Sequence, residues 1–354
     1  MWPFAWSPDG KLLGVGWRSS ARDRVMRSAS RASRRVSLGG AGALGRLVAG
    51  ELLVVRAADG TLVRHFPAPG DLSDWPGQKA SWTADGAAVL VSVVSSIRRE
   101  SHVFRCSIDT GESIDLLTVS SLWELIPSPD ARTFALYDAG QHTLDLYDEN
   151  GVHQRLAFHG LVSGYVWLPD GSMLLGGTEV STLPEVKGLF HVPASAGPLT
   201  RLTSHEHIEP HQRAGFAKGT VPVLVEREMA RGPWVSSLGV ADLPAGQLRT
   251  AECYPAASGQ AALALGGRVV LLMPYTAPPR DLWALRMRDG GWVNLTDCGD
   301  IGSYAVSPDG SKVALSRGQG NGLWILALDE KAIMAAKPAS FKTIITEPLL
   351  TKVP

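Results

Sequence analysis

The sequence predicts an all-β fold, a single seven-bladed β-propeller made of four-stranded antiparallel blades. The first observation is a short turn phrase that recurs along the chain. The second is the apolar run that follows each copy at once, as a strand follows a hairpin turn. The third is the spacing of the copies, which matches the period of a propeller blade.

The recurring phrase is made of residues suited to a tight turn. Its first copy is Trp6-Ser-Pro-Asp-Gly10. Proline fixes φ near the value needed at the second turn position, aspartate bonds back to the backbone, and glycine accepts a positive φ. Further copies follow at Trp82–Gly86, Pro127–Ala131, Trp167–Gly171 and Val306–Gly310. Each copy is therefore predicted to be the turn of a β-hairpin.

The spacing of the copies predicts the number of blades. The third residues of the phrases, Pro8, Ala84, Pro129, Pro169 and Pro308, are 76, 45, 40 and 139 residues apart. A four-stranded blade repeats about every 40–45 residues, so the last interval predicts two further blades with degraded turns. The expected strands are RAGFA, VPVLVERE, WVSSLGVAD and QLRTAE in the first, and QAALAL, RVVLLMPY, LWALRMRD and WVNLTD in the second. The second should span about residues 257–297, with RVVLLMPY buried on both faces.

Residues 18–46 are predicted to be a basic insertion in the first blade of a propeller that spans residues 1–350. The first interval is about 30 residues too long for one blade. The insertion is rich in serine and glycine, has no strand period, and holds one acid, Asp23. Its arginines are Arg18, Arg22, Arg24, Arg27, Arg31, Arg34, Arg35 and Arg46. We expect a surface loop between the second and third strands of that blade.

Composition favours a protein without a disulfide framework or a membrane span. Basic and acidic residues number 34 each, so the +7 of the insertion leaves −7 on the rest of the chain. The three cysteines, Cys106, Cys253 and Cys298, are interpreted as buried thiols. The N-terminus enters a strand directly, without the pattern of a signal peptide. The expected location is the cytoplasm, or the periplasm if a leader is missing from this chain.

The repeat resembles the TolB-type, WD-like β-propeller repeat. The Trp/Val-Ser-Pro-Asp-Gly phrase with its following strand carries the resemblance, as do Leu282–Thr296 and Pro198–Thr203, which end on Leu-Thr as that repeat does. The resemblance covers nearly the whole chain outside 18–46 and about the last 20 residues. It implies the fold more than a function, because one fold hosts many activities. A Gly-x-Ser-x-Gly nucleophile elbow does not occur in the sequence.

The candidate binding residues fall on one predicted face of the propeller. Loops from the second to the third strand of a blade, and from one blade to the next, share a face opposite the repeated turns. That face should carry the insertion and a set of basic and histidine residues. The set is Arg98, Arg99, His205, His207, His211, Arg231, Arg280 and Arg317.

The histidines are the sharpest chemical candidates on that face. With Glu206 and Glu209 nearby, His205, His207 and His211 have the ligand types of a zinc site, but their spacing matches no known motif, and a solvated polar loop is the expected reading. The aspartates of the repeated turns are expected to be engaged in their own turns. We therefore expect no metal and no cofactor.

Three functions remain open from the sequence. The favoured one is a non-catalytic scaffold whose loop face binds a macromolecular partner. We expect this partner to be a protein. Nucleic acid or an anionic surface could bind the basic insertion in the same way. The second is an enzyme of hydrolase or lyase type with its site at the mouth of the central channel, where Glu226 could join the histidines. The third is the regulatory propeller of a peptidase whose catalytic domain is absent.

Overall fold

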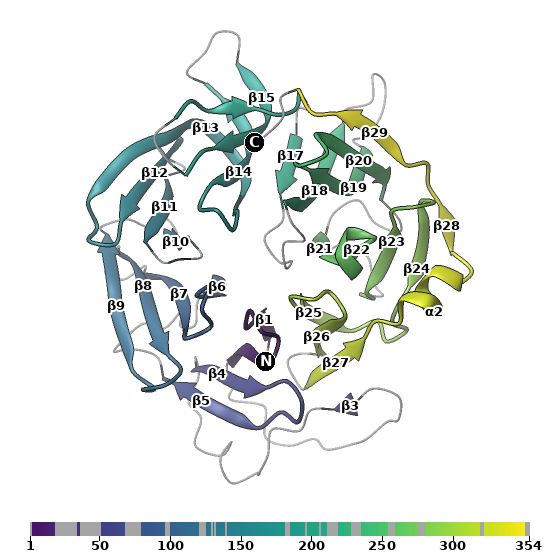
Figure 1. Cartoon of the computed structure of the whole chain (residues 1–354), viewed down its shortest axis with the longest axis horizontal. Helices are drawn as coiled ribbons and strands as arrows, with labels where there is room; N and C mark the ends of the chain where they lie inside the picture. Colours follow the sequence, from purple (N-terminus) through teal and green to yellow (C-terminus); the bar gives the residue numbers. More distant parts are fainter. Residues whose placement is uncertain are drawn as a thin grey trace.

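The structure is a computed structural model in which β-sheets follow one another around a central axis (Figure 1). It describes residues 2–17, 34–35, 51–67, 79–95, 100–119, 125–128, 130, 132–138, 140–180, 185–194, 197–204, 207–210, 219–227, 235–253, 259–274, 280–318 and 322–350. The strands of this part form six sheets, and each sheet is named below by its innermost strand. The predicted all-β class is confirmed.

The β1 and β6 sheets each have four antiparallel strands in chain order, with the first strand nearest the axis (Figure 1). The β1 sheet contains β1 (Trp2–Trp6), β2 (Leu12–Trp17), β4 (Glu51–Arg56) and β5 (Leu62–Phe66). The β6 sheet contains β6 (Lys79–Trp82), β7 (Ala88–Ser95), β8 (Glu100–Ser107) and β9 (Ser113–Val119). Both begin with the predicted phrase between their first two strands.

The β10 sheet is longer, with seven strands. These are β10 (Leu125–Pro127), β11 (Thr133–Asp138), β12 (Thr143–Asp148), β13 (His153–Trp167), β14 (Met173–Glu179), β15 (Val186–Val192) and β16 (Thr200–Arg201). The first part of β13, His153 to His159, pairs with β12, and the second part, Gly160 to Trp167, pairs with β14. One continuous strand thus closes one four-stranded unit and opens the next.

The two blades predicted inside the long interval are present as the β17 and β21 sheets. The β17 sheet contains β17 (His207–Pro210), β18 (Thr220–Arg227), β19 (Val235–Asp242), β20 (Gln247–Glu252) and β29 (Ile345–Pro348). The β21 sheet contains β21 (Gly259–Ala264), β22 (Val269–Pro274), β23 (Trp283–Arg286), β24 (Gly291–Asn294) and β28 (Ser340–Phe341). The short 3-10 turn η1 (Leu265–Gly267) joins β21 to β22.

One strand prediction in this region is wrong. β17 occupies the innermost position that was predicted for RAGFA, and the RAGFA segment lies outside the described residues. The reason is packing: the Ile208 side chain is buried, and the Ser163 hydroxyl donates to the Ile208 carbonyl over 2.8 Å. The prediction for β22 is confirmed, since all six of its residues are buried.

The β25 sheet joins the two ends of the ring. It contains β25 (Ile301–Val306), β26 (Lys312–Arg317), β27 (Leu323–Ala327) and β3 (Arg34–Arg35), so its fourth strand comes from the basic insertion. The insertion is therefore not wholly a surface excursion. β1 contacts both β25 and β6, and Trp6 and Leu13 share a hydrophobic cluster with Ala305 and Leu323.

The repeated turns have the predicted geometry. The amide of Gly10 donates to the Ser7 carbonyl over 2.9 Å, and its φ is 69°. The Ser7 hydroxyl donates to Asp9 Oδ1 over 2.7 Å, and the Lys11 amide donates to the same oxygen over 3.0 Å. Equivalent bonds to the aspartate occur on Asp85, Asp130 and Asp309. At Asp170 the amide bond is equivalent, but the hydroxyl comes from Ser172 after the turn. These carboxylates are therefore structural.

The tryptophan before the turn bonds to the preceding inner strand of the ring. Trp6 Nε1 donates to the Ala305 carbonyl over 3.0 Å, and Trp82 Nε1 donates to the Ala5 carbonyl over 3.1 Å, in each case from one sheet to its neighbour. Trp167 Nε1 donates to the Ile126 carbonyl over 3.3 Å, between the two halves of the β10 sheet. Each indole ring is buried and satisfies its one donor in this way.

The last residues form a strap along the outside of the ring (Figure 1). This C-terminal strap, residues 329–350, contains α2 (Glu330–Ala335), β28 and β29. It runs backwards past the β25 sheet, adds β28 to β24, and adds β29 to β20. The Leu350 amide then donates to the Leu202 carbonyl, just after β16, over 2.7 Å. The strap gives the β17 and β21 sheets five strands where four were predicted.

Candidate interaction face

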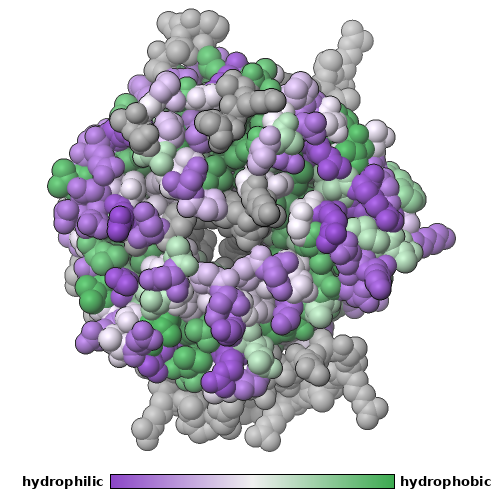
Figure 2. Space-filling model, viewed as in Figure 1, coloured by the Kyte–Doolittle hydropathy of each residue, from purple (hydrophilic) through white to green (hydrophobic). Residues whose placement is uncertain are grey.

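The two faces of the ring differ in how their segments are built. Antiparallel alternation puts the repeated turns on one face, together with the turns between third and fourth strands. The remaining connections lie on the other face, which we call the loop face. On the face of the molecule shown in Figure 2, hydrophilic residues predominate around the ring. The centre of this face is hollowed.

Most of the candidate binding residues are in segments whose structure is not described. Arg98, Arg99, His205, His211 and Arg231 lie outside the described residues. His207 is in β17, where its register partner across the inner strand pair is Glu226 of β18. Their backbones therefore place these two residues directly opposite each other, a convergence that the sequence could not reveal.

Arg280 and Arg317 are brought together at Asp300. Arg280 is exposed and forms an isolated parallel bridge with Asp300, in which its amide donates to the Gly299 carbonyl over 3.2 Å. Arg317, at the end of β26, donates from Nε to Asp300 Oδ1 over 2.8 Å. Its guanidinium lies 5.5 Å from the centroid of the Trp324 ring. Arg317 thus pairs with the Asp300 carboxylate, and the backbone of Arg280 pairs beside the same residue on the loop face.

This ion pair alters what was expected of Arg317. The hydrogen bond to Asp300 raises the pKa of Arg317, with burial opposing it. The arginine therefore remains charged, but part of its charge is balanced within the protein. Among the described residues, Arg280 makes its hydrogen bonds at this site through its backbone amide and carbonyl, and it is exposed, so it is the more available cation of the two.

Asp281 holds the loop that presents this pair of arginines. Its carboxylate is buried and accepts bonds from the Cys298 amide over 2.9 Å, the Gly299 amide over 3.0 Å and the Thr296 hydroxyl over 3.1 Å. Burial would raise the pKa of Asp281, but these hydrogen bonds hold it below its ordinary value. Asp281 and Asp300 were missed by sequence reasoning because neither is part of the repeated phrase.

The cysteines agree only in part with their interpretation as buried thiols. All three are free, and Cys106 is buried while Cys253 and Cys298 are half-buried. Burial raises the pKa of the Cys106 thiol to about 12, so it remains protonated at neutral pH. Among the described residues, no group of three or more His, Cys, Asp and Glu side chains is arranged to hold a metal ion.

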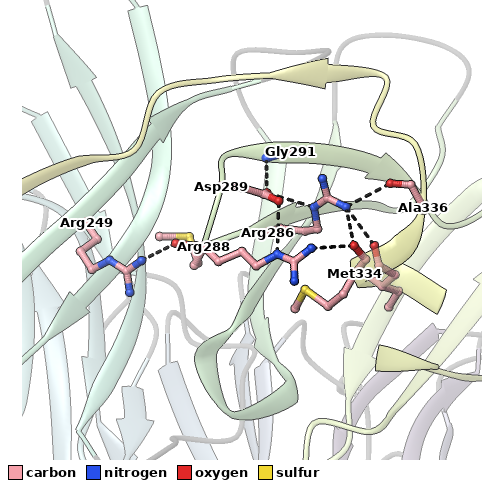
Figure 3. Close-up of polar contacts among 9 residues, drawn as sticks. Arg249, Arg286, Arg288, Asp289, Gly291, Met334 and Ala336 are labelled. Carbon is pink, nitrogen blue, oxygen red and sulfur yellow. Dashed lines mark hydrogen bonds and ion pairs between the residues drawn. The ribbon is translucent and has the colours of Figure 1, made fainter. Parts of the chain in front are cut away.

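A buried arginine fixes the C-terminal strap to the ring (Figure 3). Arg286, at the end of β23, donates from Nη1 to the carbonyls of Met334 and Ala336, each over 3.0 Å. Its Nε bonds Asp289 Oδ1 over 3.0 Å, and only 4% of its side chain is exposed. Arg288 adds a bond to the Met334 carbonyl over 2.7 Å. These cations satisfy carbonyls at the end of α2 that have no partner within the helix.

Two glycines after β23 leave room for the strap and for the arginine that binds it. A Cβ atom on Gly290 would lie 1.6 Å from the Lys342 carbonyl oxygen, and the φ of Gly290 is 71°. A Cβ atom on Gly291 would lie 2.4 Å from Arg286 Nη2. The Asp-Gly-Gly turn after β23 is therefore shaped by the strap as well as by the hairpin. In the sequence it reads as an ordinary turn.

Comparison with known proteins supports the fold. No family model and no curated protein matches the sequence. The structure is similar to the β-propeller domain of the Trilobed protease from Pyrococcus furiosus, at 12% identity, with 95% of this chain and 97% of that chain covered and a TM-score of 0.58. It is similar to Kuenenia stuttgartiensis hydrazine synthase, at 13% identity, 92% and 94% coverage and a TM-score of 0.58.

A third similar structure is oligogalacturonate lyase in complex with manganese, at 11% identity, with 93% of this chain and 89% of that chain covered and a TM-score of 0.53. The β-propeller fold that the repeat predicted is therefore confirmed. These likenesses show the fold alone, since one fold hosts many activities. In the described part, no helix is long and apolar enough to cross a membrane.

Proposed function

We propose that this propeller is a non-catalytic scaffold that binds a protein partner through its loop face. The observation that carries the proposal is that the backbone of the exposed Arg280 pairs beside Asp300, whose carboxylate binds Arg317 of β26, so that both arginines lie in one part of the loop face. Arginine and tryptophan are both enriched in binding hot spots. Arg317 lies over the half-buried ring of Trp324.

The opposite face is less suited to an adaptable contact. Its turns follow one pattern, and the aspartate and serine or threonine side chains there are bonded within each turn. Connections on the loop face vary in length and residue type, and such loops are where binding residues concentrate. The candidate residues outside the described part, Arg98, Arg99 and Arg231, belong to this proposal through their place in the sequence.

The charge of these residues favours an acidic partner. The body of the chain carries −7 against +7 in the insertion, so positive charge is local to the insertion and the arginines near it. Nucleic acid or an anionic surface would use the same attraction and is an alternative outcome of the test. Binding by exposed arginines should weaken as salt is added, because salt screens exposed charges.

Charge reversal on one face tests this proposal. The probe is a fluorescent poly-glutamate peptide, and the variants are Arg280→Glu and the double change Arg98→Glu with Arg99→Glu. Each reversal should weaken binding by about two- to five-fold, the range for exposed ion pairs. Arg132→Glu makes the same charge change beside a turn of the opposite face and should leave binding unchanged. Equal losses in all variants, or binding that is insensitive to salt, would remove the proposal.

A second candidate is an enzyme with its site at the channel mouth. The specific observation is the register of β17 and β18, which sets His207 opposite Glu226 at the loop-face end of the innermost strand pair. Residues directly opposite in an antiparallel pair share a face of the sheet. Metal analysis of the purified protein and of His207→Ala discriminates the two functions. A stoichiometric metal ion that is lost in the variant would favour the enzyme.

We also propose that the ring comprises seven blades. The count follows if the two halves of β13 belong to different blades, because the β10 sheet then divides into two units of four strands. Five blades would carry the repeated turn and two would be the degraded copies. The cytoplasmic location stays a prediction, which fractionation of the source cells tests.

A further inference from the structure

Segments from outside the repeat add strands to the outer edges of this propeller. β28 pairs with β24, β29 pairs with β20, and β3 pairs with β27. All three additions are antiparallel, and they fall on consecutive sheets. The chain itself therefore shows that its outermost strands accept an added strand.

The outer edge of the β6 sheet is available for the same pairing. β9 is the last strand of that sheet and has seven residues. The added strand β29 pairs with β20 through four residues, so β9 is long enough for a pairing of that length. Within the described residues β9 pairs with β8 alone. A strand edge of this length is a template for a further strand.

The hydrogen-bonding groups of β9 that point outward can be identified from its register. The Ser107 amide donates to the Glu112 carbonyl over 2.9 Å, so this pair is a hydrogen-bonded one. Bonded and non-bonded pairs alternate along an antiparallel ladder. The pair of Arg105 with Ile114 is therefore bonded, and the backbone groups of Ser113 and Asp115 face away from β8.

The side chains around this edge indicate the chemistry of what would bind. Asp109, Glu112 and Asp115 lie along the turn and the start of β9, and each is exposed. Asp115 also accepts from Thr118 over 2.8 Å and lies 3.0 Å from Nδ1 of the buried His102. Ile114 between them is 55% exposed, which offers an apolar contact at one position.

The chain contains a precedent for the charge pattern. Where the strap runs past the β17 sheet, Lys342 Nζ lies 2.9 Å from Glu252 Oε2 at the end of β20. An added segment with a basic side chain thus meets an acidic side chain of its host sheet. The acidic residues around β9 would select a basic segment in the same manner.

We propose that the outer edge of β9 binds an extended, basic segment of a protein partner, which adds to the β6 sheet as a fifth antiparallel strand. Backbone hydrogen bonds to Ser113 and Asp115 supply the pairing, and Asp109 and Glu112 favour lysine or arginine at alternate positions of the segment. Strand addition at an exposed sheet edge is an established mode of peptide recognition. This edge is on the rim, so the inference is independent of the loop-face function.

The test uses a fluorescent seven-residue peptide that alternates lysine and valine, with a second version N-methylated at every backbone amide, because alternate amides serve only one edge of a strand. The two peptides have equal charge, but the methylated one cannot donate the bonds of a strand. Anisotropy titrations on the full chain should show about ten-fold weaker binding of the methylated peptide. Equal binding would overturn the proposal, because the attraction would then be charge alone.

Two variants locate the binding on β9. Glu112→Lys should weaken binding of the unmethylated peptide by about two- to five-fold, whereas Asp297→Lys, an exposed residue after β24 in another sheet, should leave it unchanged. Ser113→Pro removes an outward amide without removing a bond to β8 and should weaken binding of the unmethylated peptide. Equal effects of Glu112→Lys and Asp297→Lys would overturn the proposal. Arg280→Glu should not affect this peptide, which separates the inference from the loop-face function.

Discussion

The attachment of the C-terminal strap depends most on Arg286, and replacing this residue by alanine is expected to release the strap. The guanidinium donates to the Met334 and Ala336 carbonyls and to Asp289, and the side chain is almost fully buried. Each hydrogen bond to a charged group is worth roughly 1.5–3 kcal/mol, and water that enters the vacated space recovers part of the loss. We expect a cost of about 3 kcal/mol, in the range for breaking a buried pair.

Hydrogen exchange measures this cost where it occurs. The Ala339 amide donates to the Trp292 carbonyl and the Lys342 amide to the Gly290 carbonyl, each over 2.8 Å. If the strap opens locally, 3 kcal/mol corresponds to about a hundred-fold faster exchange of these two amides. Amides of β22, in the centre of the same sheet, should keep their protection because the sheet remains folded.

Two control variants separate the guanidinium from its charge. Arg288→Ala removes one bond to the strap and an ion pair with Asp289 from a side chain that is 58% exposed, so we expect a loss below about 1 kcal/mol. Arg286→Lys keeps the charge but lacks the planar fork that reaches two carbonyls and a carboxylate at once, and it should behave like alanine. Unchanged exchange of Ala339 and Lys342 in Arg286→Ala would refute the reasoning.

Four further predictions follow from single features. Gly290→Ala should also release β28, because its Cβ would overlap the Lys342 carbonyl; exchange of the Lys342 amide measures it. Leu271→Asp, in the fully buried β22, should cost several kcal/mol in urea unfolding, since an unpaired charge would be buried there. Deletion of residues 19–46 removes β3, which pairs through only two residues, so the ring should remain folded with a loss of about 1 kcal/mol. Bonds from the hydroxyls of Ser307 and Ser311 lower the pKa of Asp309 from 3.8 to about 2, so its contribution is complete above pH 4 and is lost as the pH falls towards 2. Discounted for solvent screening it is about 1 kcal/mol, and acid unfolding of Asp309→Asn should lack it.

The local elements of this fold follow from local chemistry. Proline, aspartate and glycine in the repeated phrase set the turn at Ser7–Gly10, and the observed bonds are those the residue types predict. The apolar run Val269–Met273 lacks polar alternation because both of its faces are buried. The interval between copies of the phrase corresponds to about one blade. The two blades whose turns have lost the phrase could therefore also be located along the chain.

Features that depend on which segments meet in space could not be predicted in this way. The innermost strand of the β17 sheet is β17, whose Ile208 packs against the neighbouring sheet, and not the RAGFA segment that the sequence predicted. The pairing of Arg317 with Asp300 joins residues 17 positions apart through a fold contact that their local sequence does not encode.

The sequence by itself determined the repeat, its turns and the burial of its strands, since each depends on residues within a few positions of one another. Only the tertiary structure decided the course of the strap, the joining of the ring by β3 and the burial of Arg286. The physical reason is that edge pairing uses backbone groups, which every residue carries. The identity of the strand that fills an edge is therefore set by where the rest of the chain places it.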